Sequence, residues 1–422
     1  MAKPLRVALL GFGTVGSWVA RILIERPELA DRLQLTHIYN RDVARKRVAW
    51  VPGSVAWTDD VEALFAAKPD VVIELIGGLD PAGGWVDRAL AQGASVVTAN
   101  KMLMAARGPE LLRLAVTNDA QIRFEAAVGG GVPLIHGIKE GLAGDRLSRV
   151  AGILNGTCNY TLSRMEDTDE SLEVVLADAR RLGYAEADPS ADIDGDDAAA
   201  KIVVLAGIAF HRHLRMADVP RRSIRRVAGA DFKYARRLGC TIRQVALVEA
   251  AGAETFHAFV GPALVEAHSG FGRTYGADNF VTVAGRFLGE SSFTGPGAGG
   301  SATAVAVVSD LLSLAARPGR DVREEWQPAS VVPAPARPYY LRFVVRDRLG
   351  ILTAIAGALE RHGINVDAVL QEPGYPKDAL PFVITVDPVE EAALEVALAG
   401  IAGADFHAAA PLALPMFGGK SR

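Results

Sequence analysis

The chain has few of the features that mark secreted, membrane-spanning or nucleic-acid-binding proteins. Only two of its 422 residues are cysteines, Cys158 and Cys240, which excludes a disulfide framework and fits a reducing compartment. Its longest apolar run, residues 202–210, is too short to span a bilayer. The net charge of −4 offers no positive field for nucleic acid. We therefore expect a cytoplasmic protein that engages neither a membrane nor a nucleic acid.

A glycine-rich turn lies between a predicted strand and a predicted helix near the start of the chain. The apolar run at 5–10 is typical of a buried parallel strand, and the periodic segment after the turn predicts a helix that stops at Pro27. In that context, glycines allow backbone N–H groups to approach a pyrophosphate at the helix N-terminus. A plain structural turn is the alternative. The residues predicted to contact a dinucleotide are Gly11, Phe12, Gly13, Thr14, Val15 and Gly16.

The next predicted strand, 33–39, ends in Asn40, Arg41 and Asp42. A site specific for NAD usually places an acid at this strand end to bind the ribose 2′-hydroxyl. Here Asn40 and Arg41 stand there instead, and an arginine can pair with a 2′-phosphate. This pattern favours NADP, with both residues as cofactor contacts. An exposed arginine with no ligand is the alternative, and Asp42 keeps NAD possible.

Two further strand ends are predicted at the carboxyl edge of the same parallel sheet, where ligands of open α/β folds bind. The run at 70–78 ends in Gly77 and Gly78, and the run at 95–101 ends in Asn100 and Lys101. Gly77 is therefore a candidate cofactor contact, and Lys101 is a candidate contact for the substrate and the cofactor.

Two glycine-rich segments follow farther along the chain. Residues 121–133 predict a last strand that runs into a glycine hinge. The run at 295–300 precedes an alanine- and valine-rich helix, and such a helix start can make a second phosphate or ribose contact, with Gly297 as the candidate. The alternative is a loop that lets this helix pack back on the first domain.

The acidic stretch at 179–201 is the strongest functional signal. It carries six acids and then a single lysine, Lys201, at the start of a wholly apolar run. A helix is predicted from about Gly195, so that Asp197 and Lys201 lie on one helix face at i and i+4. Burial there favours a neutral amine, which carboxylates would hold in place. An ordinary solvated acidic loop is the alternative.

The order of these motifs resembles that of homoserine dehydrogenases. The glycine turn is followed by TANK at 98–101, NGTCNY at 155–160, the acidic stretch and GPGAGG at 295–300. This resemblance covers nearly the whole chain. It implies the NAD(P)-dependent interconversion of L-homoserine and L-aspartate 4-semialdehyde, in the route to threonine and methionine.

The resemblance also implies roles for individual residues. Lys201 matches the family's proton-transferring lysine and Lys101 its second essential lysine. Glu186 matches the residue that holds the substrate amino group. The other implied contacts are Asp192, Asp197, Tyr184 and Thr157 for the substrate, Gly183 for the cofactor, and Glu125, Val128, Gly130 and Val132 for a sodium ion bound largely through carbonyl oxygens.

The C-terminal residues 338–415 predict the element order βαββαβ of a ferredoxin-like module. This module resembles an ACT domain, and the turn 347–350 stands where that family binds amino-acid effectors. The resemblance implies threonine as the effector, although Leu349 occupies a position at which many ACT turns have proline. A purely structural dimerisation module is the alternative.

The fold expected from these patterns is an α/β protein in three parts. A doubly wound NAD(P)-binding Rossmann domain spans 1–129, and an α+β domain for substrate binding and dimerisation spans 130–315, its end packing back on the first. A linker at 316–337 leads to the ACT module. We expect a homo-oligomer, either dimer or tetramer. The rival functions are a dehydrogenase of another small amino acid and a non-catalytic sensor of nucleotides and amino acids.

Overall fold

The computed structural model describes residues 3–316 and 324–418, so the predicted linker at 316–337 lies partly outside the described residues. The chain divides into two compact units, each assembled from three segments. Unit 1 comprises Met1–Leu154, Ala198–Val219 and Val281–Ser330, and unit 2 comprises Asn155–Asp197, Pro220–Phe280 and Val331–Arg422. Within the described ranges, no helix is both long and apolar enough to cross a membrane.

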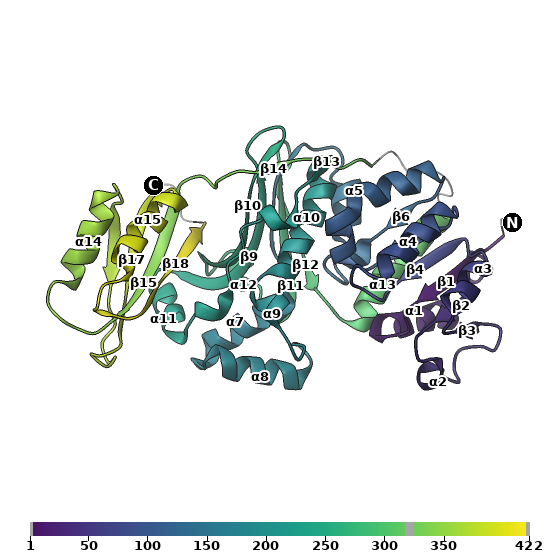
Figure 1. The fold of residues 1–422 in the computed structure, drawn as a ribbon, viewed down its shortest axis with the longest axis horizontal. Helices are drawn as coiled ribbons and strands as arrows, with labels where there is room; N and C mark the ends of the chain where they lie inside the picture. The colour runs from purple at the N-terminus through teal and green to yellow at the C-terminus, as the bar shows by residue number, and fades with distance from the viewer. Residues whose placement is uncertain (1–2, 317–323, 419–422) are drawn as a thin grey trace. The chain divides into compact units, whose positions relative to one another are not determined.

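Unit 1 contains a six-stranded parallel sheet in the order β3-β2-β1-β4-β5-β6 (Figure 1). This is the order of the doubly wound nucleotide-binding fold, so the predicted fold class is confirmed. The strands are β1 (Leu5–Leu10), β2 (Leu33–Tyr39), β3 (Ala56–Thr58), β4 (Val71–Glu74), β5 (Ser95–Thr98) and β6 (Ile122–Arg123). The helices of this region are α1 (Thr14–Glu25), α2 (Val43–Lys46), α3 (Val61–Ala66), α4 (Ala82–Ala91) and α5 (Lys101–Thr117).

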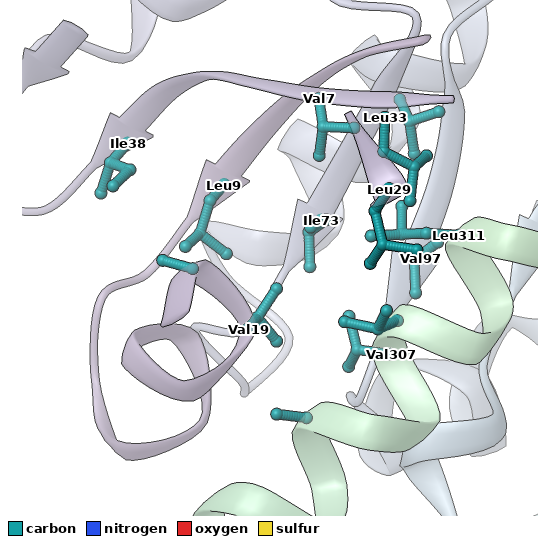
Figure 2. Packing of buried hydrophobic residues seen from close by; sticks show 14 of the residues in the cluster. Val7, Leu9, Val19, Leu29, Leu33, Ile38, Ile73, Val97, Val307 and Leu311 are labelled. Carbon is teal, nitrogen blue, oxygen red and sulfur yellow. The ribbon is translucent and has the colours of Figure 1, made fainter. Parts of the chain in front are cut away.

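A helix from much later in the chain completes the core of this sheet. Val307 and Leu311 of α13 (Gly300–Ala316) pack in one cluster with Leu9, Ile73 and Val97 of the sheet (Figure 2). The alanine and valine side chains of α13 are small, so this helix can lie close to the sheet. Other helices and strands of the unit are α6 (Leu134–His136), β7 (Leu147–Ile153), most of α10 (Asp196–Phe210), β8 (Arg212–His213), most of β11 (Asp278–Gly285), β12 (Gly289–Pro296) and β13 (Gln327–Pro328).

The last strand predicted within 121–133 is present but short. Only Ile122–Arg123 pairs with the sheet, and a 3-10 turn at Glu125–Ala127 follows. The cause is the buried side chain of Glu125, which accepts hydrogen bonds from the N–H groups of Ile135 and His136 at 2.9 and 2.7 Å. These bonds turn the chain away from the sheet.

Unit 2 contains six strands that pair in the order β9-β10-β18-β15-β17-β16. The last strand of the chain, β18, pairs in parallel with β10 and antiparallel with β15, so the C-terminal module extends the sheet of the preceding domain. The predicted βαββαβ order is confirmed as β15 (Arg337–Val345), α14 (Ile351–Arg361), β16 (Val366–Leu370), β17 (Leu380–Val389), α15 (Glu391–Ala402) and β18 (His407–Phe417). The preceding elements are α7 (Gly156–Thr168), α8 (Leu172–Leu182), α9 (Ser190–Ile193), α11 (Gly229–Arg237), β9 (Cys240–Ala250), β10 (Thr255–Glu266) and α12 (Gly270–Arg273).

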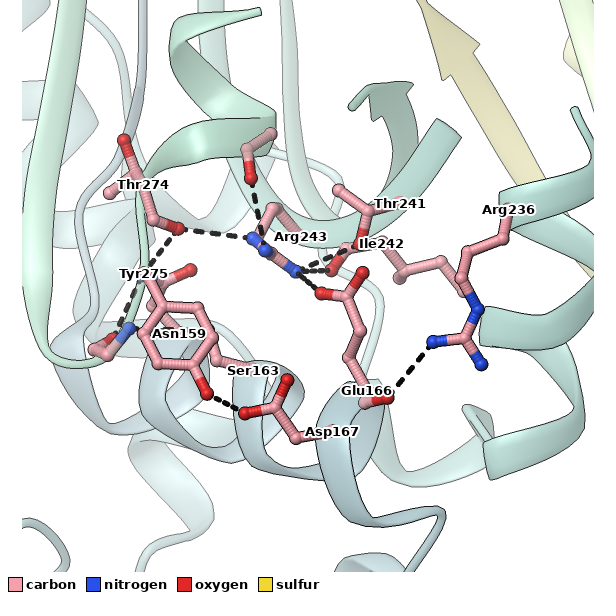
Figure 3. Close-up of polar contacts among 12 residues, drawn as sticks. Asn159, Ser163, Glu166, Asp167, Arg236, Thr241, Ile242, Arg243, Thr274 and Tyr275 are labelled. Atoms are coloured by element: carbon pink, nitrogen blue, oxygen red, sulfur yellow. Dashed lines mark hydrogen bonds and ion pairs between the residues drawn. The ribbon is translucent and has the colours of Figure 1, made fainter. Parts of the chain in front are cut away.

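A buried arginine joins α7 to the sheet of unit 2. The side chain of Arg243, on β9, is 2% exposed and donates to the carboxylate of Glu166, near the end of α7, at 2.9 Å. The same guanidinium donates to the carbonyl oxygens of Gly272, in α12, and of Thr274, directly after that helix (Figure 3). A guanidinium has five N–H groups, so one side chain can bond several acceptors and fix helix, strand and loop together.

Candidate active site

The first glycine turn has two positions that accept no side chain. Gly11 has a φ of +104°, and a Cβ there would lie 2.9 Å from the carbonyl oxygen of Leu75. A Cβ at Gly16 would lie 2.1 Å from the carbonyl oxygen of Gly11. At Gly13, by contrast, no atom of the described residues lies within 4 Å of the Cβ position. The turn is therefore tight on its protein side and open where α1 begins, which fits a phosphate group at the helix N-terminus.

The other residues of the turn either begin α1 or pack in the core. Thr14 and Val15 form the first turn of α1. Phe12 is buried and packs edge-on against Trp57, with ring centroids 4.8 Å apart. Phe12 can therefore serve a nucleotide through its backbone, while its ring anchors the turn in the core.

The end of β2 lies beside this turn, because the N–H of Gly11 donates to the carbonyl oxygen of Tyr39 at 3.0 Å. The side-chain oxygen of Asn40 accepts from the N–H of Asp42, whose carboxylate caps α2 by accepting from the N–H of Arg45. Arg41 is exposed between them. The loop is thus braced by its own side chains and presents an arginine next to the nucleotide turn.

A buried glutamate organises the loop after β4. Glu74 is fully buried and accepts hydrogen bonds from the N–H groups of Ile76 and Gly77, at 2.8 and 2.9 Å. Its other oxygen accepts from the hydroxyl of Thr98 at 2.6 Å. The carboxylate therefore fixes Gly77 beside the end of β5.

The same network fixes the start of α5. The hydroxyl of Thr98 accepts from the N–H of Asn100, and the Asn100 amide donates to the carbonyl oxygen of Gly78 at 2.6 Å. The side-chain oxygen of Asn100 caps the helix through the N–H of Leu103. Lys101 is consequently held as the first residue of α5 at the carboxyl edge of the sheet.

The second glycine-rich loop lies against the first one within unit 1. A Cβ at Gly300 would lie 2.8 Å from side-chain atoms of both Thr14 and Trp18 on α1. A Cβ at Gly130 would lie 2.7 Å from the carbonyl oxygen of Gly297. Gly297 therefore lies among elements that surround the start of α1, next to the glycine hinge.

Lys201 lies on α10, one turn after Asp197, and the predicted helix start is confirmed. Its ammonium nitrogen donates to the carbonyl oxygen of Leu154 at 2.8 Å, immediately after β7. The residues around it on α10, Ala200 and Ile202, are buried. The amine is thus tied to one backbone carbonyl at the start of an apolar helix.

Thr157 and Tyr184 are brought together in unit 2. The hydroxyl of Thr157, on α7, donates to the carbonyl oxygen of Tyr184 at 2.7 Å. The rings of Tyr160 and Tyr184 stack with centroids 4.6 Å apart. Gly183 ends α8 with a φ of +82°, which turns the chain toward Tyr184. Glu186, two residues later, is exposed.

Asp192 and Asp197 are bridged by one amide group. The side-chain nitrogen of Asn155 donates to Asp192 Oδ1 at 2.7 Å and to Asp197 Oδ2 at 2.8 Å. Nearby Cys158 is fully buried, and its thiol donates to the backbone oxygen of Asp192. Burial raises the pKa of the Cys158 thiol well above its ordinary value, and the charges of Asp192 and Asp197 add to the rise. This cysteine is a packed thiol and no nucleophile.

The predicted cation ligands surround the glycine hinge. The carboxylate of Glu125 is 2% exposed and, besides its backbone bonds, contacts the ring nitrogen Nδ1 of His136 at 2.7 Å. That contact raises the pKa of His136, while burial raises the pKa of the nearby Asp310 to about 7. Among the described residues, no group of three or more His, Cys, Asp and Glu side chains is arranged for a metal ion. A cation at this place would need backbone carbonyl oxygens, such as those of Val128, Gly130 and Val132.

Sequence reasoning missed the roles of Glu74, Thr98 and Asn155 in positioning this site. The signal for Glu74 was present, because a lone acid in the otherwise apolar run VVIELIGG requires a partner when buried. The bridge from Asn155 to Asp192 and Asp197 crosses 37 and 42 positions of sequence. No local pattern could have indicated it.

Comparisons with known proteins agree over the whole chain. The family described as "Homoserine dehydrogenase" matches residues 133–312, its NAD-binding domain matches 11–125, and the ACT domain matches 339–399. A homoserine dehydrogenase of Mycobacterium tuberculosis is 40% identical over 88% of this chain and 87% of its own length.

Solved structures give the same result. The homoserine dehydrogenase of Thiobacillus denitrificans matches with a TM-score of 0.90 at 32% identity, over 98% of both chains. A hyperthermophilic archaeal homoserine dehydrogenase in complex with NADPH matches with a TM-score of 0.64 at 27% identity, over 75% of this chain and 99% of its own. This chain, with its NAD(P)-binding domain and C-terminal ACT domain, therefore belongs to the homoserine dehydrogenase family of oxidoreductases.

Proposed function

We propose that the chain interconverts L-homoserine and L-aspartate 4-semialdehyde with NADP, and that Lys201 transfers the proton. The observation that carries this proposal is the bond from the Lys201 ammonium to the Leu154 carbonyl. An ammonium has three N–H groups, so this bond is compatible with a second one to the substrate oxygen. The neighbours of Lys201 on α10, Ala200 and Ile202, are apolar and buried.

The residues divide the chemistry between them. When bound, the nicotinamide cofactor accepts or supplies the hydride. In the oxidation, the Lys201 amine takes the proton of the substrate hydroxyl. In the reduction, the protonated amine returns that proton to the aldehyde oxygen. Glu186, Asp192, Asp197, Tyr184 and Thr157 are proposed to bind the amino acid, and Lys101 its oxygens.

The decisive test is Lys201→Ala with Lys233→Ala as the control. Lys233 is a half-exposed lysine on α11 that pairs with Asp169, away from the proposed chemistry. We expect Lys201→Ala to lower kcat by about a hundredfold to ten-thousandfold, the usual contribution of a general acid–base. NADPH binding, followed by fluorescence, should stay unchanged in both variants. Activity of Lys201→Ala within a few-fold of the parent would contradict the proposal.

NADP is proposed over NAD on the evidence of Arg41. This arginine is exposed at the end of β2, where a 2′-phosphate would lie. The predicted cofactor contacts from Gly11 to Gly16, Asn40, Gly77, Lys101, Gly183 and Gly297 would hold the nucleotide. Arg41→Ala should raise KM for NADPH and leave KM for NADH unchanged. An equal effect on both KM values would contradict a contact between Arg41 and the 2′-phosphate.

A sodium ion is proposed at the glycine hinge, bound by carbonyl oxygens near Glu125, Val128, Gly130 and Val132. Gly129 and Gly130 have φ values of +80° and +55°, and such a turn can present successive carbonyl groups to one point. A carbonyl oxygen has two lone pairs, so one that accepts a backbone bond can still bind a cation. The test is the Tm in NaCl against choline chloride at equal ionic strength, and equal values would contradict the site.

The remaining proposals concern regulation, assembly and location. We propose inhibition by threonine at the ACT domain, where Gly350, with a φ of +86°, begins α14 beside the fully exposed Leu349. A flat activity across a threonine titration would exclude it. We propose a cytoplasmic homo-oligomer, dimer or tetramer, which mass photometry would distinguish from a monomer.

A further inference from the structure

Asn155 lies between β7 and α7 in the chain, and both the oxygen and the nitrogen of its side-chain amide form hydrogen bonds. It is 3% exposed. Its side-chain oxygen caps α7 by accepting from the N–H of Cys158 at 2.8 Å. That bond fixes the orientation of the amide, because the capping position needs an acceptor and not an NH₂ group. The two N–H groups of the amide therefore face Asp192 and Asp197.

The backbone of Asp192 is held in the same place by two further donors. The Cys158 thiol and the side-chain amide of Gln244 both donate to the Asp192 carbonyl oxygen, at 3.1 and 3.2 Å. Gln244 lies on β9 and is 2% exposed. At Asp192, the acidic loop is thus attached both to the start of α7 and to β9.

Two carboxylates that share one small group repel each other, and one of them tends to take up a proton. An amide offsets this tendency, because each of its N–H groups hydrogen-bonds one ionised carboxylate. The amide is neutral, so this bond stabilises the pair without cancelling its charge. A lysine or arginine in the same place would hold the carboxylates and neutralise one of them.

We propose that Asn155 is a positioning residue, which fixes Asp192 and Asp197 in one geometry that binds the substrate ammonium group. This inference rests on the proposed function. It assigns to Asn155 a role in the recognition of an amino-acid substrate, separate from proton transfer and from cofactor binding.

The test compares two variants at Asn155 with one at Asn159. Asn155→Ser keeps a good helix cap and loses the amide, while Asn155→Asp keeps the cap and the shape but replaces donors with a third carboxylate. The control, Asn159→Ala, removes a second fully buried amide of α7. Its N–H groups donate to carbonyl oxygens of the loop after α12, with the bond to Gly276 at 2.9 Å (Figure 3).

We expect Asn155→Ser to raise KM for homoserine by about tenfold to a hundredfold, because two bonds to charged groups are lost. The kcat and the KM for NADPH should change less than about threefold. Asn155→Asp should also move the acid limb of kcat/KM for homoserine to higher pH, since one of three carboxylates would hold a proton. Asn159→Ala should lower Tm and leave KM and the pH profile unchanged.

A second readout does not depend on turnover. In ¹³C NMR of the carboxyl groups, Asp192 and Asp197 should titrate at higher pH in Asn155→Ser than in the parent. A parent enzyme without homoserine turnover would refute the proposed function, and the NMR titration would still decide the role of Asn155. Unchanged titration, or an equal rise of KM in Asn159→Ala, would overturn the inference.

Discussion

Unit 2 holds carboxylates in two different ways. Asp231, on α11, is fully buried and accepts from the Arg342 guanidinium at 2.7 Å, the Tyr340 hydroxyl at 2.7 Å and the N–H of Ala228 at 2.8 Å. Asp192 and Asp197 are bridged instead by the neutral amide of Asn155. In the first arrangement a fixed cation balances the buried charge. In the second, the donor that bridges the two carboxylates is uncharged.

The difference separates a structural cluster from a proposed binding site. Arg342 and Tyr340 lie on β15 of the ACT domain, so the Asp231 cluster joins that domain to α11. A balanced buried ion pair has little attraction for a ligand, and its loss exposes one partner as an unpaired buried charge. A carboxylate pair held by an amide retains its attraction for a substrate ammonium group. Variants in the Asp231 cluster should therefore lower the free energy of unfolding, and variants at Asn155 should raise KM for homoserine.

The largest effect on stability is expected from Arg342→Met. Removal of the guanidinium leaves Asp231 as a buried acid without this cation, which costs about 3–5 kcal/mol. Burial already raises the pKa of Asp231, and Arg342 opposes that rise. An acid whose pKa is higher in the folded chain binds its proton more tightly when folded, so the free energy of unfolding falls as pH increases through that range. Urea unfolding should show a smaller deficit at pH 5 than at pH 7.

The matched control for this prediction is Arg346→Met. Arg346 is exposed on the same domain, and its guanidinium donates to the carbonyl oxygens of Asp405 and His407. Its removal should cost less than about 1 kcal/mol, since it leaves no buried charge unpaired. Similar losses in both variants would show that the Asp231 cluster is no stronger than a surface contact.

An intermediate effect is expected from Glu74→Gln in unit 1, where neutral donors also hold a buried acid. The amide would present an NH₂ group to the N–H groups of Ile76 and Gly77 or to the hydroxyl of Thr98, and one of these bonds would be lost. KM for NADPH should rise by about tenfold, with KM for homoserine within about threefold. Glu62→Gln, an exposed acid paired with Arg88, is the control. A larger change for homoserine than for NADPH would contradict this assignment.

The smallest effect is expected from Arg225→Gln at the edge of the acidic loop. Its guanidinium lowers the pKa of Asp194 through a hydrogen bond. A lowered pKa contributes stability above the unfolded-state pKa, and this contribution is lost as pH falls through the folded-state pKa. Both side chains are substantially exposed, so the change should stay below about 1 kcal/mol. NMR titration should show the pKa of Asp194 moving up, and an unchanged value would exclude the pair.

Most of the fold could be predicted because its signals are local. The apolar run at 5–10, the glycine turn after it and the strand at 33–39 appear with their predicted bounds. The βαββαβ order of the ACT domain followed from alternating patterns within short windows. The sequence did not indicate how short the strand within 121–133 is, since the partners of Glu125 come from ten and eleven residues later in the chain and from Asp310.

The sequence by itself indicated the candidate residues for the chemistry, which are a lysine after an acidic loop and a glycine turn after a strand, and its motif spacing indicated the family. Tertiary structure alone decided what holds those residues in place. The amide of Asn155 on two distant carboxylates, the Glu74 carboxylate on the loop after β4 and the extension of one sheet by β18 all join segments far apart in the chain. A hydrogen bond depends on the distance between two groups in space, and a sequence pattern records only their separation along the chain.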